Sequence, residues 1–180
     1  MTDKESTSSW IKSNLITIFY AVIIALLIRT FLFQPFFIPS SSMEPGLLVG
    51  DRIFASKYDY GYSRHSFPFS LPIINGRVLE SSPKRGDVVI FKPPNTRNDY
   101  IKRLIGLPGD KIRILDGTIY INSSPVEREF VRTDDKDIAI YKETMVNGVS
   151  YEIRDLGNMP QDNIEEFIVP ESHYFFMGDN

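Results

Sequence analysis

Three consecutive serines, Ser40 to Ser42, are the first residues in the chain whose type could carry out chemistry. They lie in the stretch "FFIPSSSMEPG", directly behind a long apolar segment. A serine hydroxyl becomes an effective nucleophile only when a base lies within hydrogen-bond reach. Two other interpretations fit the same residues: a solvated linker, or a helix cap, because Ser41 and Glu44 match the S-x-x-E capping box. Taken alone, these residues favour the cap or the linker.

The base that a serine nucleophile needs could be a histidine or a lysine. The chain has two histidines, His65 and His173, and neither has a recognisable local signature, so a solvated or structural role is the better interpretation for both. Lys102 differs, because in a strand over Tyr100–Ile105 it would share one face with a tyrosine and a leucine. Desolvation on that face would lower its pKa. The alternative is a lysine whose stem packs while its ammonium group reaches water.

Composition excludes several other kinds of site. The absence of cysteine rules out thiol nucleophiles, cysteine-based zinc sites and disulfides. Two histidines are too few for an all-histidine metal site, so we expect neither a metal nor a cofactor. A net charge of -3 without a long basic run predicts no nucleic-acid partner. At 180 residues the chain is long enough for one domain with a hydrophobic core.

The N-terminal apolar segment, Leu15–Phe33, carries a single charge at Arg29. As a helix it would span roughly 28 Å, close to the hydrocarbon thickness of a bilayer. A cleavable secretory signal is the alternative, although its apolar region would be unusually long. We predict a retained anchor, with residues 1–12 in the cytoplasm, a transmembrane helix over 13–33 and a β-rich domain over 34–180.

Strand signals dominate after Gln34-Pro35, where proline should end the helix. "GDVVIFKPP" predicts a buried strand over Val88–Phe91, and "HYFFM" predicts a short one. "KIRILDGTIYIN" predicts a hairpin around Asp116-Gly117, a dipeptide typical of type I′ turns, and "ETMVNGVSYEI" repeats that pattern around Asn147-Gly148. "TDDKD", Thr133–Asp137, is expected to be a solvated loop. The fold class predicted is mainly β, with antiparallel sheets behind one transmembrane helix.

Four motifs occur in a fixed order behind the apolar segment: "IPSSSMEPGLLVGD", "RGDVVIFKPP", "YIKRLIGLPGDKI" and "MGDN". Together they resemble the bacterial type I signal peptidases (leader peptidases), serine proteases that use a Ser-Lys dyad. The resemblance implies a single-pass protein of the cytoplasmic (inner) membrane, with its N-terminus inside and its catalytic domain on the outer face. The implied partners are preproteins that carry signal peptides and the lipid bilayer, with the protein secretion machinery nearby.

The resemblance also implies residue roles. Ser42 would be the nucleophile and Lys102 its general base, while the Ser40 hydroxyl and the Ser42 N–H would form the oxyanion hole. Asp179 would support the site. The cleft would bind an extended preprotein segment with small residues at -1 and -3, without metal or cofactor. The positions that match its lining are Phe36, Ile38, Met43, Leu47, Tyr100 and Ile101.

The sequence departs from the family pattern in three places. Ser41 stands where the family often has glycine, and Gly46 where it usually has threonine. The family continues beyond "GDN" with an Arg/Asp/Ser-rich stretch that orients the lysine, and the expected partner of Asp179 lies there. A second hypothesis is therefore a truncated, catalytically impaired form that acts only as a membrane-anchored module binding signal peptides.

Overall fold

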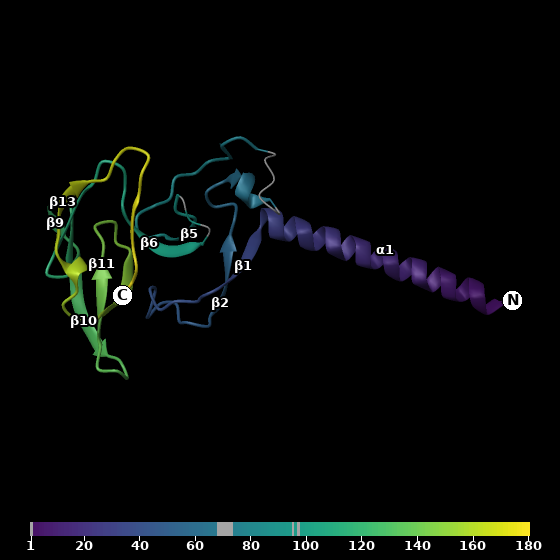
Figure 1. Ribbon diagram of the computed structural model, residues 1–180, viewed down its shortest axis with the longest axis horizontal. Coiled ribbons are helices and arrows are strands. Elements are labelled where there is room, and N and C mark those ends of the chain that lie inside the picture. The colour runs from purple at the N-terminus through teal and green to yellow at the C-terminus, as the bar shows by residue number, and fades with distance from the viewer. Residues whose placement is uncertain (1, 68–73, 95, 97) are drawn as a thin grey trace. The chain divides into compact units, whose positions relative to one another are not determined.

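The computed structural model describes residues 2–67, 74–94, 96 and 98–180 (Figure 1). The chain divides into two compact units. The first comprises Met1–Phe36 with Ile53–Ser82, and the second comprises Phe37–Arg52 with Pro83–Asn180. Helix is concentrated in the first unit, whereas antiparallel sheets make up most of the second. The prediction of a mainly β protein behind one apolar helix is therefore confirmed.

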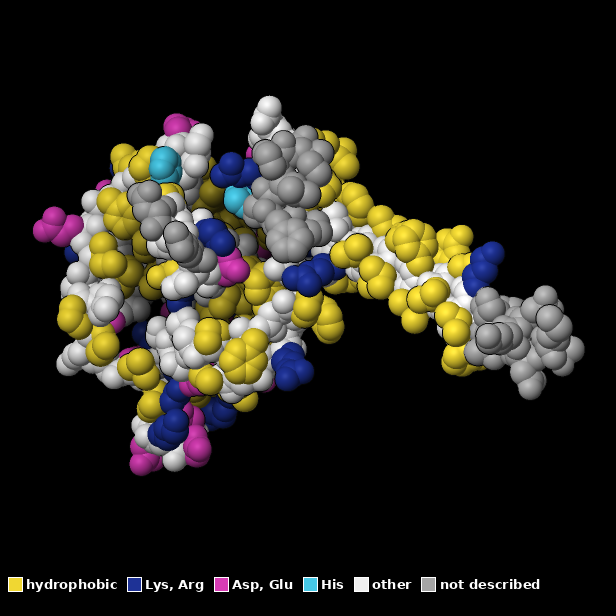
Figure 2. All heavy atoms as spheres, turned by 45° about the vertical axis from the view of Figure 1, so that its right-hand side comes forward, with side chains coloured by type: hydrophobic (Ala, Val, Ile, Leu, Met, Phe, Trp, Pro, Cys, Tyr) yellow, Lys and Arg dark blue, Asp and Glu magenta, His cyan; other side chains and the backbone are white. Residues whose placement is uncertain are grey.

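Helix α1, Thr2–Phe31, dominates the first unit. Its segment Trp10–Phe31 has a mean hydropathy of 2.2 and is unburied in its most apolar part, and hydrophobic side chains cover it in Figure 2. By length and composition this segment could cross a membrane. The helix ends two residues before the expected Phe33, because the carbonyl of Leu32 accepts the Lys57 N–H at 2.9 Å instead of a helical partner.

Short strands complete the first unit. The side chain of Lys57 donates to the carbonyl oxygens of Arg29 at 3.2 Å and Ser66 at 2.7 Å. The Arg29 carbonyl lies in the last turn of α1, where carbonyl groups lack a helical donor. The remaining elements are β1 (Phe33–Phe37) paired with β2 (Arg52–Ser56), β3 (Tyr62–Ser63) paired with β4 (Arg77–Val78), and the 3-10 turn η1 (Arg64–Ser66).

Three antiparallel sheets form the second unit. The first has the order β14-β6-β5, with strands Phe175–Met177, Tyr100–Gly106 and Val88–Phe91. The second has the order β13-β7-β8-β9, with strands Ile164–Ile168, Lys111–Leu115, Thr118–Ile121 and Ser124–Pro125. The third has the order β10-β11-β12, with strands Glu127–Thr133, Ala139–Thr144 and Ser150–Asp155. The turn η3 covers Pro160–Asp162.

Both predicted hairpins are confirmed. In β7–β8, Asp116 and Gly117 have φ angles of 47° and 74°, as a type I′ turn requires. The β11–β12 turn differs from this pattern, because only Gly148 of the Asn147-Gly148 pair has a positive φ, of 82°. There the Gly148 N–H donates to the carbonyl of Met145 at 2.8 Å.

The hydrophobic core lies among the sheets of the second unit. Ile105 from β6 meets Ile112 from β7 and Tyr151 from β12 in one buried cluster. Strand β5 was predicted to be buried, and this prediction is wrong for Val88, which is 42% exposed. The reason is topological: β5 is the edge strand of its sheet, so β6 covers only one of its sides. The cluster is completed by Ile119, Ile121, Val126, Met145 and Val169.

Candidate active site

The three serines lie in the loop between β1 and β2. Ser42 is half-buried, and its hydroxyl oxygen lies 3.4 Å from that of Ser40. The Glu44 N–H donates to the backbone carbonyl of Ser41 at 2.8 Å, and Leu47 N–H donates to that of Met43 at 2.8 Å. These bonds close two successive turns, the first of which contains Ser42.

The capping-box interpretation of this loop is wrong. A capping box needs the Glu44 carboxylate to turn back to the backbone at Ser41. Instead, the carboxylate forms an ion pair with Arg154 of strand β12. Arg154 is separated from Glu44 by 110 positions in the chain, so no local pattern could indicate this partner.

Lys102 lies on β6 opposite Val89 of β5 and is half-buried. Removal from water lowers its pKa, and the nearby carboxylate of Asp179 opposes that shift only in part. Because burial disfavours the ammonium form, this lysine loses its proton more readily than a solvated one. Among the alternatives that the sequence left open, the structure favours the desolvated lysine over one whose head reaches free water.

Gly178 connects the lysine with the serine loop. It follows β14, whose Met177 pairs with Arg103 of β6, so Gly178 comes next to Lys102. A Cβ built on Gly178 would lie 3.2 Å from the Lys102 Nζ and 2.3 Å from the Ser42 carbonyl oxygen. The lysine nitrogen and the Ser42 backbone therefore converge on the same small space.

Asp179 is 2% exposed and joins three parts of the site. Its carboxylate accepts from Arg103 Nε at 2.8 Å and Nη2 at 2.7 Å, and its N–H donates to the carbonyl of Ser42 at 3.0 Å. Burial raises the pKa of this carboxyl group, and the Arg103 guanidinium counteracts the rise. Within the chain, Arg103 is an ion-pair partner of Asp179 that the sequence did not indicate.

The next residue adds a further contact to the loop. The side chain of Asn180 donates to the backbone carbonyl of Ser41 at 2.6 Å. Asp179 and Asn180 thus bind the backbone carbonyl groups of Ser42 and Ser41, respectively. Among the described residues, no acceptor binds the Ser42 N–H, so this donor is available to a ligand.

The residues matched to the substrate cleft differ in accessibility. Ile38 and Met43 are 2% and 1% exposed, so their side chains are packed inside the protein. Leu47 and Ile101 are half-buried, whereas Tyr100 is 44% exposed. Phe36 lies on β1 in the first unit and is half-buried.

Each histidine has a hydrogen bond within its own turn. The imidazole Nδ1 of His173 lies 2.9 Å from the carbonyl oxygen of Glu171 in its own turn. His65 lies in η1, where its Nε2 accepts from the neighbouring Arg64 Nε at 3.3 Å. These contacts fit the structural role that the sequence favoured for both residues.

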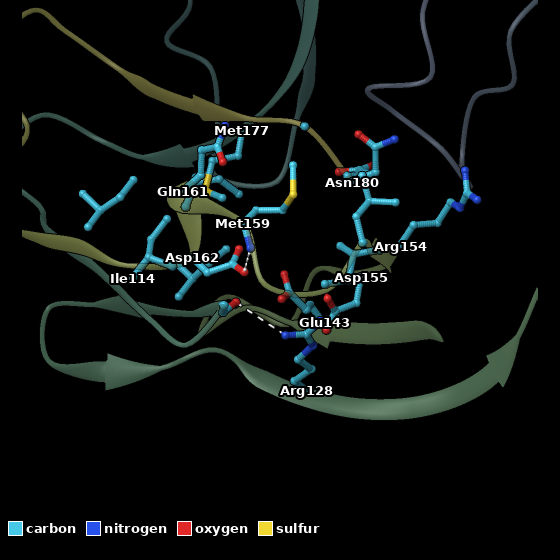
Figure 3. A pocket seen from close by; sticks show the side chains of 18 of the residues that line it. Ile114, Arg128, Glu143, Arg154, Asp155, Met159, Gln161, Asp162, Met177 and Asn180 are labelled. Atoms are coloured by element: carbon cyan, nitrogen blue, oxygen red, sulfur yellow. Dashed lines mark hydrogen bonds and ion pairs between the residues drawn. The ribbon is translucent and has the colours of Figure 1, made fainter. Parts of the chain in front are cut away.

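Residues 178–180 also form part of the wall of a cavity of about 370 Å³ (Figure 3). Figure 3 shows Arg128, Glu143 and Asp155 gathered on one side of it. Glu143 is 2% exposed and accepts from the Tyr151 hydroxyl at 2.6 Å. None of the six residues matched to the substrate cleft lines this cavity.

Sequence reasoning assigned no role to three residues that shape the site. Arg103 stacks over the ring of Tyr151, with 4.2 Å between its Cζ and the ring centroid, while it binds Asp179. Gly178 leaves the space for the lysine, and Arg154 holds Glu44. The motifs "YIKR" and "MGDN" contain two of these residues, but nothing local to Arg154 indicates its contact.

Comparison with known proteins identifies the family. The family described as "Signal peptidase, peptidase S26" matches residues 9–180. The chain belongs to this family. Signal peptidase I of Rickettsia akari (strain Hartford) is 42% identical over 191 residues, which cover 98% of this chain and 72% of the relative. Signal peptidase I of Rickettsia canadensis (strain McKiel) is 44% identical over 175 residues, or 89% of this chain and 66% of the relative.

The breadth of the match bears on the site. Signal peptidase I of Rickettsia typhi (strain Wilmington) is 42% identical over 99% of this chain and 73% of its own length. The matched region contains the serine loop, β6 and residues 178–180 together. The resemblance inferred from four motifs is therefore confirmed at the level of the family, and the protein is a hydrolase of the signal peptidase I type.

Proposed function

We propose that the protein is a membrane-anchored serine endopeptidase that removes signal peptides from exported preproteins, with Ser42 as nucleophile and Lys102 as general base. One observation carries the proposal. The Lys102 Nζ and the Ser42 backbone approach the same point beside Gly178. Burial also lowers the pKa of Lys102. A lysine with a lowered pKa can be neutral and can accept a proton from a serine hydroxyl.

The reaction follows from this pairing. Neutral Lys102 takes the proton from the Ser42 hydroxyl as its oxygen attacks the carbonyl carbon of the scissile peptide bond. The carbon–nitrogen bond then breaks, and the lysine returns the proton to the departing amine. The product is an ester between Ser42 and the signal peptide. Water, deprotonated by the same lysine, then attacks the carbonyl carbon of this ester. The bond between that carbon and the Ser42 oxygen breaks, the lysine returns the proton to this oxygen, and the peptide leaves with a free carboxyl end.

Two donors in the loop suit the oxyanion that develops during the attack. The Ser42 N–H has no acceptor among the described residues, and the Ser40 hydroxyl lies 3.4 Å from that of Ser42. Donors fixed in advance near developing charge each contribute roughly 3 kcal/mol to transition-state stabilisation. The hydrogen bonds from Asp179 and Asn180 to this loop favour such a fixed arrangement.

The substrate is an extended preprotein segment with small side chains at -1 and -3. Tyr100 and Ile101 begin β6, one residue before the lysine, where a bound strand could pair with the chain by β-augmentation. Leu47 is half-buried in the serine loop and belongs to the same proposed cleft. These apolar side chains suit alanine-sized groups better than charged ones.

Helix α1 anchors the protein in the cytoplasmic membrane in this proposal. Its apolar segment Trp10–Phe31 has the required length and hydropathy. The short N-terminus stays inside, and the β domain works outside, where preproteins emerge from the secretion machinery. The proposed domain boundaries at residues 12 and 33 enclose the apolar run, within which α1 ends at Phe31.

Cleavage of a purified preprotein in detergent tests the function. Ser42→Ala and Lys102→Ala should each abolish cleavage without lowering Tm, whereas Lys92→Ala, an exposed lysine paired with Asp99, should retain it. For the parent, kcat/KM should rise with pH through a pKa below 10.5, because burial favours the neutral lysine. Normal processing by folded Lys102→Ala would refute the dyad. Binding without turnover by the parent would favour the non-catalytic binding module.

A further inference from the structure

Arg154 of β12 makes an unusual set of contacts close to the serine loop. Its side chain is 9% exposed and forms ion pairs with the carboxylates of Glu44 and Asp134, the latter at 2.7 Å. Arg154 is one of the residues that line the cavity, and Figure 3 shows its side chain on the opposite side from Ile114. Glu44 lies two residues after Ser42, so the guanidinium group is attached directly to the turn that carries the proposed nucleophile.

The backbone of Arg154 reaches the same loop by a second route. Its N–H donates to the carbonyl oxygen of Asp179 at 2.8 Å, and the Asp179 N–H donates to the carbonyl oxygen of Ser42 at 3.0 Å. Arg154 therefore contacts the loop in two ways: its side chain binds Glu44, and its backbone binds Asp179, which in turn binds Ser42. A shift of the loop relative to β12 would break the ion pair or one of these hydrogen bonds.

Asp134 gives the arginine a fixed orientation. Its carboxylate accepts the N–H groups of Lys136 at 2.8 Å and Ile138 at 2.9 Å, so its own turn immobilises it. The backbone donor at Ile138 is the largest cause that lowers the pKa of Asp134, which keeps it ionised. A planar guanidinium can bind two carboxylates in a set geometry, whereas a lysine ammonium acts as a single point charge.

Burial makes this arrangement sensitive to change. The Arg154 Nε is buried and has no hydrogen-bond partner among the described residues. The buried positive charge is therefore balanced by the carboxylates of Glu44 and Asp134. Removing one partner of a buried charge leaves it uncompensated and is strongly unfavourable. Glu44 is thereby held in one position, and with it the turn that follows Ser42.

We propose that Arg154 is a positioning residue: through Glu44 it holds the Ser42 turn in the geometry that the nucleophile needs. The inference rests on the proposed function. Arg154 is assigned no contact with the reacting atoms, because it binds the loop on the residue after Met43. Its effect should therefore appear in the rate of the chemical step rather than in substrate binding.

Kinetics and hydrogen–deuterium exchange of the full chain test the proposal with Arg154→Lys and Glu44→Gln. We expect kcat to fall about 10- to 100-fold, as small misplacements of reacting groups do, while KM stays within about twofold. Amides of residues 41–47 should exchange at least about fivefold faster, since local opening sets their protection. The matched control is Arg132→Lys, whose arginine forms an exposed pair with Glu152 on the same sheet.

The two readouts separate the inference from the function on which it rests. If the parent does not cleave a preprotein, the proposed function fails, and exchange alone decides whether Arg154 holds the loop. Unchanged exchange over 41–47 and unchanged kcat in folded Glu44→Gln and Arg154→Lys would overturn the inference. If Arg154→Lys does not fold, Glu44→Gln decides, because it keeps the shape of the side chain and removes only the charge.

Discussion

At Gly178 the backbone passes so close to the serine loop that no side chain fits. The nearest atom to an added Cβ would be the Ser42 carbonyl oxygen, at 2.3 Å, a separation that neither backbone segment can relieve without moving. Because the lysine nitrogen lies on the same side, any shift there also moves the proposed base. The absence of a side chain at Gly178 thus allows Lys102 and the Ser42 backbone to approach each other.

We predict that Gly178→Ala lowers kcat/KM for preprotein cleavage at least about 100-fold, because displacement of reacting groups by roughly 1 Å costs that much. The measurement is steady-state cleavage of a preprotein by the parent and the variant at equal folded concentration. Gly46→Ala is the matched control in the serine loop, since its Cβ would meet nothing closer than 3.6 Å. Equal activities of the two variants would contradict the prediction.

Residue types in the site could be predicted from the sequence, but their partners could not. The strand face of Lys102 left two interpretations open, a desolvated base and a lysine whose ammonium group reaches water, and the lowered pKa favours the first. The partner of Asp179, in contrast, lies 76 positions away, and that of Glu44 lies 110 positions away. "TDDKD" looked solvated, yet its Asp134 binds the buried Arg154, because charge patterns do not reveal tertiary contacts.

At the level of elements, β6 is the strand on which the site depends. Successive residues of a strand point to opposite faces, so Lys102 and Arg103 are directed to different neighbours. Strand β14 pairs with β6 at Arg103 and continues into residues 178–180. The sheet β14-β6-β5 therefore brings the proposed base and the residues that hold the serine loop together.

Strand β7 belongs to the core that supports β6, and its Ile112 is fully buried. We predict that Ile112→Ala lowers the free energy of unfolding by about 3 kcal/mol, through lost transfer energy and the cavity left behind. Denaturant titration followed by circular dichroism measures the change. Ile168→Ala on the paired strand β13, at 59% exposure, should change it by less than about 0.5 kcal/mol. Similar losses in both variants would argue against the core assignment.

The elements themselves were largely predictable, because their signals are local. Alternating apolar residues and the Asp116-Gly117 turn predicted the β7–β8 hairpin correctly. The end of α1 and the exposure of β5 were not predicted, since the first depends on Lys57 and the second on strand order. Sheet order reflects contacts between distant segments, which a single sequence does not display.

At the scale of the whole molecule, the absence of cysteine offers a direct test of membrane orientation. Single cysteines can be introduced at Glu129, which is exposed on β10, and at Thr2 before the apolar segment. We predict that a membrane-impermeant maleimide labels intact cells or spheroplasts at position 129 and labels position 2 only after lysis. The protein should also remain in the membrane fraction after extraction with alkaline carbonate. The reverse labelling pattern would refute the proposed orientation.

The hydrogen bond from Asn180 to Ser41 spans 139 positions of the chain, and this distance has a consequence for biosynthesis. A ribosome adds on the order of ten residues per second, so roughly ten seconds separate synthesis of the serine loop from synthesis of the residues that hold it. During that interval the growing polypeptide contains its own apolar segment and the proposed nucleophile, but not the contacts that hold the serine loop. We expect nascent chains halted before Gly178 to be inactive, which would spare the enzyme's own N-terminal segment while it enters the membrane.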